Sequence, residues 1–126
     1  MNNFYIIVVL FIVLSLTSCE KIEKKIVDSN IGENRLTILK FDDGKYIVNG
    51  EYNSDVKPTS DFIKADLILE YHIGLAKWNE NRIEIYSQYG TFDTIAANGK
   101  LKLIKISTKE FEELKKDKTQ YTHFYY

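Results

Sequence analysis

The stretch RLTILKFDDGKYIVNGEY, residues 35–52, decides the fold of this chain. Apolar and polar side chains alternate on both sides of the segment DDGK (42–45), and alternation with period two is typical of half-buried β-strands. Gly44 supplies the positive φ that a tight turn needs. The stretch therefore predicts a β-hairpin with strands over 35–41 and 46–52.

The next stretch, FIKADLILEYHIGLAKW at 62–78, contains the longest alternation in the chain. Every second residue from Ile63 to Leu75 is apolar, which favours one long strand. A helix is the alternative, because apolar residues also recur at every fourth position, but that period leaves three apolar residues unexplained. A strand this long needs neighbours of similar length or must bend across two sheets, and Gly74 is the residue that can bend it or form a bulge.

Shorter patterns complete the predicted fold. They indicate four more strands, the last of them at a sheet edge: 83–89, 91–96, 101–106 and 121–126. The turn ANGK at 97–100 predicts a hairpin, and Ser107 with Glu110 forms a capping box that predicts one helix after it. We expect a mainly β (α+β) domain: an antiparallel sheet of six to seven strands, as a sandwich or a partly open barrel, with one C-terminal helix.

Composition limits the classes of partner. The chain has 126 residues, which suits one domain, and 44% hydrophobic with 28% charged residues is typical of a globular protein. Its 17 basic and 18 acidic residues give a formal net charge of -1. Because nucleic-acid binding needs a basic surface, we expect no nucleic-acid partner.

The chain begins with an apolar segment, FYIIVVLFIVL at 4–14. As a helix this segment spans about 16 Å, which is too short to cross a hydrocarbon core of about 30 Å. Its length is that of the apolar region of a signal peptide. Cys19, the only cysteine, follows five residues later, so the chain has neither an internal disulfide nor a zinc site made of several cysteines.

The residues Leu16-Thr17-Ser18-Cys19 resemble the lipobox of bacterial lipoproteins, in which an aliphatic and two small residues precede a cysteine. The resemblance implies cleavage between Ser18 and Cys19, a diacylglycerol on the Cys19 thiol, and a place in the bacterial cell envelope, anchored to the outer or cell membrane. It divides the chain into a signal peptide at 1–18, the lipidated cysteine with a polar tether at 19–34, and a single β-rich domain at 35–126. Fully extended, the tether reaches about 50 Å.

Two alternatives to lipidation stay open. In one, the apolar segment is an uncut signal anchor and Cys19 is an idle thiol. In the other, an ordinary secretory peptidase cuts near Ser18.

The sequence contains no set of residues that indicates catalysis. His72 and Glu70 are a conceivable acid–base pair, but neighbours on one strand face more often form a solvated polar stripe. We expect His123 to be an edge-strand residue, and Asp42 to Gly44 to be a turn rather than the start of a calcium loop. The G-x-S-x-G elbow and the glycine-rich phosphate loops are absent from the sequence. We therefore expect no enzyme, no cofactor and no metal.

The aromatic residues are the candidates for contact with a partner or ligand. Trp78, the single tryptophan, is either a core residue whose N–H reaches a turn or an exposed anchor for a partner. The C-terminal aromatics Tyr121, Phe124 and Tyr125 either complete the core or form an exposed patch.

The function that we expect is that of a membrane-anchored envelope lipoprotein with a non-catalytic domain. This domain would bind another protein, as an accessory subunit, an assembly factor or an immunity-type inhibitor. The alternative is a lipoprotein that binds a small ligand or glycan in a pocket lined by aromatic side chains.

Overall fold

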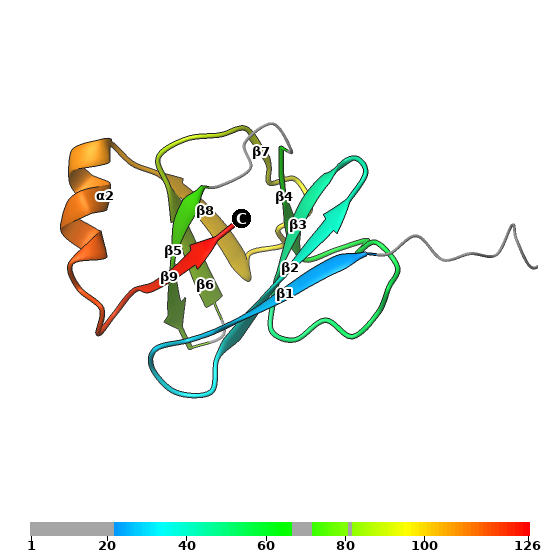
Figure 1. The fold of residues 1–126 in the computed structure, drawn as a ribbon, viewed down its shortest axis with the longest axis horizontal. Coiled ribbons are helices and arrows are strands. Elements are labelled where there is room, and N and C mark those ends of the chain that lie inside the picture. The colour runs from blue at the N-terminus through cyan, green and yellow to red at the C-terminus, as the bar shows by residue number, and fades with distance from the viewer. Residues whose placement is uncertain (1–21, 67–71, 81) are drawn as a thin grey trace, which may run out of the picture.

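A computed structural model describes residues 22–66, 72–80 and 82–126 and places two β-sheets face to face (Figure 1). The five-stranded sheet contains, in spatial order, β1 (Glu23–Asp28), β2 (Arg35–Phe41), β3 (Gly44–Asn49), β4 (Phe62–Ala65) and β7 (Phe92–Asp93). The four-stranded sheet contains β8 (Leu101–Lys105), β6 (Arg82–Ser87), β5 (Ile73–Asn79) and β9 (Thr122–Tyr125). The single helix of the described residues, α2 (Thr108–Lys115), precedes β9. The mainly β class with a C-terminal helix is therefore confirmed.

The hairpin predicted at 35–52 is present as β2 and β3. The two strands pair antiparallel from Leu36 opposite Asn49 to Phe41 opposite Gly44. Gly44 has a φ of 153°, and a Cβ there would lie 2.9 Å from the carbonyl oxygen of Ala65. Glycine at this position therefore meets both the dihedral angle of the turn and the close approach of β4.

The stretch 62–78 belongs to both sheets, which is the second of the two arrangements predicted for it, although β4 and β5 are separate strands. Its first part is β4, which pairs with β3 in the five-stranded sheet, and its last part is β5, which pairs with β6 and β9 in the four-stranded sheet. Residues 67–71 lie outside the described part of the chain. The apolar residues of the two parts face different cores: Ile63 and Ala65 of β4 face the space between the sheets, whereas Ile73 and Leu75 of β5 belong to the cluster under helix α2.

The N-terminal polar segment is also more ordered than the sequence indicated. We expected a tether at 20–34 with at most one helical turn, but Glu23–Asp28 forms β1 at the edge of the five-stranded sheet. It pairs antiparallel with all of β2 except Phe41. Four of its six side chains are charged, a composition that protects exposed strand edges from aggregation and that disguises the strand in the sequence.

One strand connection departs from the antiparallel prediction. After β6 the chain crosses to the other sheet, adds β7 beside β4, and returns as β8, which lies parallel to β6. The hairpin predicted at the turn 97–100 is therefore wrong, since the strands on either side of that turn belong to different sheets. With β1 counted and the long strand divided, the described residues hold nine strands rather than six or seven.

The main core lies between the two sheets. It consists of the inward-facing residues of both: Val27, Leu36, Ile38, Ile47, Ile63, Ala65, Ala76, Ile83, Ile85, Leu101, Phe124 and Tyr126. No ladder joins β1 to β9 within the part of the chain that the structure describes, so the sheets form a sandwich rather than a closed barrel.

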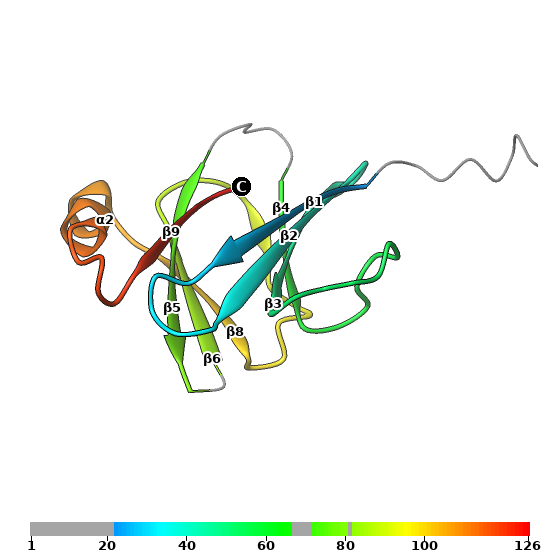
Figure 2. The same ribbon diagram turned by 60° about the horizontal axis from the view of Figure 1, so that its bottom comes forward.

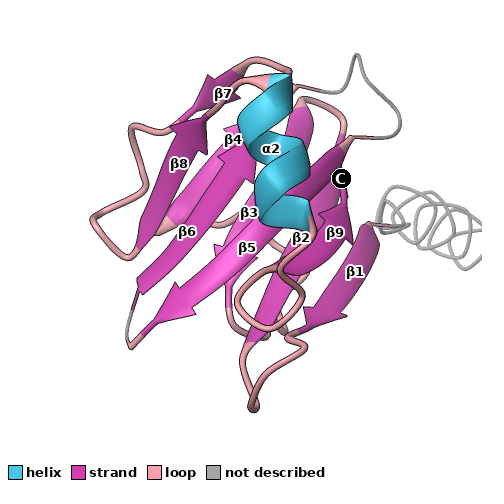
Figure 3. Ribbon diagram, turned by 90° about the vertical axis from the view of Figure 1, so that its left-hand side faces the viewer, coloured by secondary structure: helices cyan, strands magenta, loops and turns pink. Residues whose placement is uncertain are grey.

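The outer faces of both sheets are covered as well. Helix α2 packs on the four-stranded sheet, where Phe111 joins Leu75 and Tyr121 in a second cluster (Figure 3). The loop 50–61 covers the five-stranded sheet, because the Thr37 hydroxyl donates to the Gly50 carbonyl at 2.6 Å and Thr37 is fully buried. The fold thus has loop, sheet, sheet and helix in succession (Figure 2).

The predicted helix begins where the capping pattern indicated. The Ser107 hydroxyl accepts a hydrogen bond from the backbone N–H of Glu110 at 3.2 Å. At the other end, Nε2 of His123 lies 3.0 Å from the carbonyl oxygen of Lys115 and donates to it when protonated there. His123 is therefore an edge-strand residue, as predicted, and it satisfies one of the free carbonyls of the helix end.

Gly74 provides a test of the contact between β5 and β9. A Cβ on Gly74 would lie 2.7 and 2.9 Å from two atoms of the Phe124 ring, and both residues are buried. Overpacking of this kind costs about 2 kcal/mol, so we expect Gly74→Ala to lower the free energy of unfolding by that amount in urea titrations. Phe124→Leu in the same chain should restore part of the loss; simple additivity of the two changes would contradict the contact.

Candidate functional site

The structure separates the four aromatic residues that the sequence singled out. Tyr121 and Phe124 are buried, at 8% and 2% exposure, and belong to the two cores on opposite faces of the four-stranded sheet. Tyr125 is 53% exposed. Trp78 is half-buried at the end of β5, and its indole N–H donates to Oδ1 of Asn49 at 3.2 Å. They therefore do not form one aromatic patch. Ser18 and Cys19 lie outside the described residues.

Tyr125 is nevertheless part of a contact between the two sheets. The ammonium of Lys25 lies 5.3 Å from the centre of the Tyr125 ring, within the range of a cation–π interaction. Lys25 belongs to β1 and Tyr125 to β9, so this contact joins the edge strands of the two sheets.

His72 lies in an aromatic environment rather than in an acid–base pair. Its ring centre is 5.6 Å from that of Tyr126 and 6.2 Å from that of Tyr89, and its Nε2 is buried without a hydrogen-bond partner among the described residues. Glu70, the partner considered from the sequence, lies outside them. Burial raises the pKa of Tyr126, whose hydroxyl lies 2.7 Å from that of Ser87. His72, Tyr89, Ser87 and Tyr126 therefore pack together beside the core between the sheets.

A candidate site of a different kind lies around the loop 29–34. The loop begins at the end of β1 and is closed by a hydrogen bond from the Ser29 N–H to the Asn34 carbonyl at 2.9 Å. Asn30 fastens it to the other sheet: its backbone N–H donates to the Thr122 hydroxyl at 3.0 Å, and its side-chain amide donates to the Tyr121 carbonyl at 3.4 Å. The loop therefore bridges β1 and β9 and has a fixed position.

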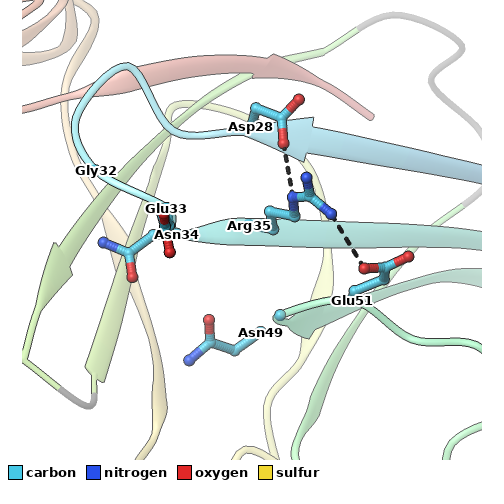
Figure 4. A pocket seen from close by; sticks show the side chains of 8 residues that line it. Asp28, Gly32, Glu33, Asn34, Arg35, Asn49 and Glu51 are labelled. Atoms are coloured by element: carbon cyan, nitrogen blue, oxygen red, sulfur yellow. Dashed lines mark hydrogen bonds and ion pairs between the residues drawn. The ribbon is translucent and has the colours of Figure 1, made fainter.

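A hollow of about 670 Å³ lies on one side of this loop (Figure 4). Its lining residues are Asp28, Gly32, Glu33, Asn34, Arg35, Asn49, Gly50 and Glu51. Arg35 stands between two carboxylates, with Nε 2.9 Å from Asp28 and Nη1 3.1 Å from Glu51. Three acidic residues and one basic residue line the hollow, so its charge favours a cationic group.

A smaller hollow of about 220 Å³ lies on the other side of the loop and shares Asn34 with the first. It is lined by Ser29, Ile31, Asn34, Lys77, Trp78, Thr119 and Gln120. Ile31 is 52% exposed, and Trp78 provides a second apolar surface within a polar rim. The two hollows are neighbours, because they share Asn34 and because Asn49 of the first accepts a hydrogen bond from Trp78 of the second. We treat them as two parts of one candidate site, which we call the end groove.

A separate polar cluster lies at the β2–β3 hairpin. Asp43 accepts from the Tyr46 hydroxyl at 2.8 Å and from Nζ of Lys64 at 3.0 Å, and Nζ of Lys57 is 3.3 Å away. These bonds, led by the one from Tyr46, hold the pKa of Asp43 well below its usual value of 3.8. The cluster ties the loop 50–61 and β4 to the hairpin, and none of its members lines the end groove.

The end groove is lined by hydroxyl, amide, charged and apolar side chains. Its hydroxyl groups belong to Ser29 and Thr119, and neither histidine lines it. Among the described residues, no three side chains of His, Cys, Asp or Glu lie together as metal ligands would. No helix in the same part of the chain has the length and apolar character to span a bilayer.

Comparison with family models, with curated proteins and with solved structures finds no match to this chain.

Six of the fourteen residues that line the end groove lie in 20–34, and the sequence analysis missed them because it assigned this segment to a tether. The sequence of this segment nevertheless contains signals for a strand and a turn. Ile26 and Val27 are β-branched residues, and SNIG at 29–32 after them is a turn sequence. Gly32 has a φ of 72°, which this turn requires. Asn49 gave no signal, because its role depends on contact with a tryptophan 29 positions away.

The Asp43 cluster predicts a pH-dependent contribution to stability. A lowered pKa in the folded state stabilises the fold above the unfolded value of 3.8 and loses this effect as the pH falls below it. Because the Asp43 side chain is 42% exposed, we expect Asp43→Asn to cost only about 1 kcal/mol near pH 7. The difference from the unmodified protein should shrink below about pH 4 in urea titrations. Asp42→Asn is the matched control, and an equal loss in both variants would contradict this role.

Proposed function

We propose that this chain is a bacterial envelope lipoprotein, anchored to a membrane through Cys19, whose β domain binds another protein at the end groove. The anchor rests on the resemblance of residues 16–19 to the lipobox and on the apolar segment at 4–14. The observation that carries the binding function is that two large apolar side chains, Ile31 and the half-buried Trp78, line the smaller hollow among polar residues.

This arrangement has the features of a protein-binding surface. Interfaces commonly centre on a tryptophan or other large apolar side chain and are surrounded by polar groups that exclude water. Ile31 and Trp78 provide the centre, and Asn34 and Gln120 belong to the rim. The acidic hollow beside them is complementary to a lysine or arginine. The partner that fits presents an apolar side chain next to a basic one.

The groove is also held in place before any partner arrives. Asn30 ties the loop 29–34 to β9, and the bond to Asn49 fixes the indole of Trp78. A site that is already ordered loses less conformational entropy when it binds. This rigidity supports recognition of a folded partner without rearrangement of the groove.

A small glycan is the second candidate for the same site. The observation that favours it is the smaller hollow, where an indole lies beside the amides of Asn34 and Gln120 and the hydroxyl of Thr119. A few convergent polar groups next to an aromatic face are typical of small-ligand sites. A glycan ligand would change the fluorescence of Trp78 and would leave position 31 without a protein adduct.

Lipidation can be tested by the intact mass of the chain purified from its own membrane. We expect the mass of residues 19–126 plus that of the acyl chains on Cys19, because each buried CH₂ adds about 0.8 kcal/mol and stable anchoring takes two chains. Cys19→Ala should lack the acyl mass. A wild-type mass equal to residues 1–126 with a free thiol would refute the anchor.

The binding function can be tested by photo-crosslinking in living cells. A photoreactive amino acid in place of Ile31 should give one protein adduct of discrete mass. The same group in place of Ile95, which is 91% exposed and does not line the end groove, is the matched control. Glu33→Lys should weaken the adduct, because it reverses one charge of the acidic hollow.

We expect a discrete adduct from the probe at position 31 and none from the control probe at position 95. Equal adducts at positions 31 and 95, or an adduct at position 31 that Glu33→Lys does not weaken, would contradict binding at the end groove.

A further inference from the structure

The first strand begins very close to the anchoring cysteine. Only Glu20, Lys21 and Ile22 lie between Cys19 and Glu23, where β1 starts. Even a fully extended chain covers only about 14 Å over this distance. The tether expected at 19–34 would reach about 50 Å when fully extended, so the formation of β1 shortens the reach of the anchor to less than a third of that distance.

The surface at this end of β1 can be identified from its contacts. Glu23 is paired with Lys40 near the end of β2, at 3.8 Å, and Lys24 is paired with Asp55 in the loop 50–61, also at 3.8 Å. In Figures 1 and 2 the hairpin between β2 and β3 and the loop 50–61 lie on the side of the domain where β1 begins. We call this surface, formed by 41–44 and 53–57 with the start of β1, the anchor end.

The end groove lies at the opposite end of the same strand. β1 runs from Glu23 to Asp28, which lines the larger hollow, and the loop 29–34 follows directly. At about 3.3 Å per residue, these two ends of the strand are about 17 Å apart. The reach of the anchor is therefore shorter than the strand that separates it from the groove.

We propose that the domain of the acylated protein stands with its anchor end on the phospholipid surface and its end groove directed away from the bilayer. This inference rests on the proposed lipidation of Cys19. In the inverted orientation, with the end groove on the bilayer, Glu23 would lie on the side of the domain away from the membrane. The three residues between Cys19 and Glu23 are too short to reach that side.

The chemistry of the anchor end suits a layer of phospholipid headgroups. Val56 is 69% exposed at the tip of the loop 50–61, and Lys57 follows it. Charges of both signs surround this tip, among them the pairs Lys24–Asp55 and Lys57–Asp43. Headgroups that carry a phosphate and an amine offer partners for both signs, and a single exposed valine can insert at the surface without spanning it.

The inference can be tested by the quenching of tryptophan fluorescence in vesicles. The acylated full-length chain is placed in phospholipid vesicles that carry a quencher on the headgroup. Trp78 is replaced by Phe, and one new tryptophan is introduced in a matched pair of variants, Val56→Trp and Ile31→Trp, both at exposed positions. We expect Trp at position 56 to lose most of its emission and Trp at position 31 to keep most of it.

A further variant separates orientation from anchoring. A flexible Gly/Ser linker, longer than β1 and placed between Ile22 and Glu23, should reduce the difference between the two positions because the domain can then turn. Equal quenching at positions 31 and 56, or stronger quenching at position 31, would overturn the proposed orientation. Failure of the protein to float with the vesicles, together with an unacylated mass, would instead refute the lipidation itself.

Discussion

The structure depends on the close pairing of β5 and β9. Gly74 has no side chain, and the ring of Phe124 occupies the space above it. This contact brings the last strand into the four-stranded sheet, where its alternating residues serve three purposes. Phe124 fills the core between the sheets, His123 meets the end of α2, and Thr122 accepts the bond that holds the loop 29–34. The helix, the core and the end groove are therefore linked through one edge strand.

Local patterns predicted the elements whose interactions are local. The hairpin 35–52 and the cap of α2 are determined by residues within a few positions of each other, so their sequences were sufficient. The division of 62–78 between two sheets was one of two arrangements that the sequence left open, and local patterns could not decide between them. Alternation indicates that one face of a strand is buried. It does not indicate whether the whole stretch lies in one sheet or is divided between two. The parallel pairing of β8 with β6 likewise depends on a crossover through the other sheet.

The candidate site was predicted only in part, for a related reason. Trp78 was a candidate from the sequence because of its residue type, and it does line the smaller hollow. Of its neighbours in the smaller hollow, Ser29, Ile31 and Asn34 come from the segment that was assigned to a tether, and Thr119 and Gln120 follow α2. Strand β1 pairs with only one neighbour, so its outer residues are not selected for burial and carry little periodic signal. Edge strands are for this reason the elements that sequence patterns identify least well.

The antiparallel pairing of β1 with β2 has a mechanical consequence. If the chain is held at Cys19 and a partner is held at Trp78 in the other sheet, tension between them passes through the β1–β2 ladder along the strand direction. Inter-strand hydrogen bonds lie across that direction, so the six residue pairs of this ladder are loaded in shear and must yield together instead of opening one after another. The domain would thus resist a pull from the membrane far better than a pull that peels β1 sideways.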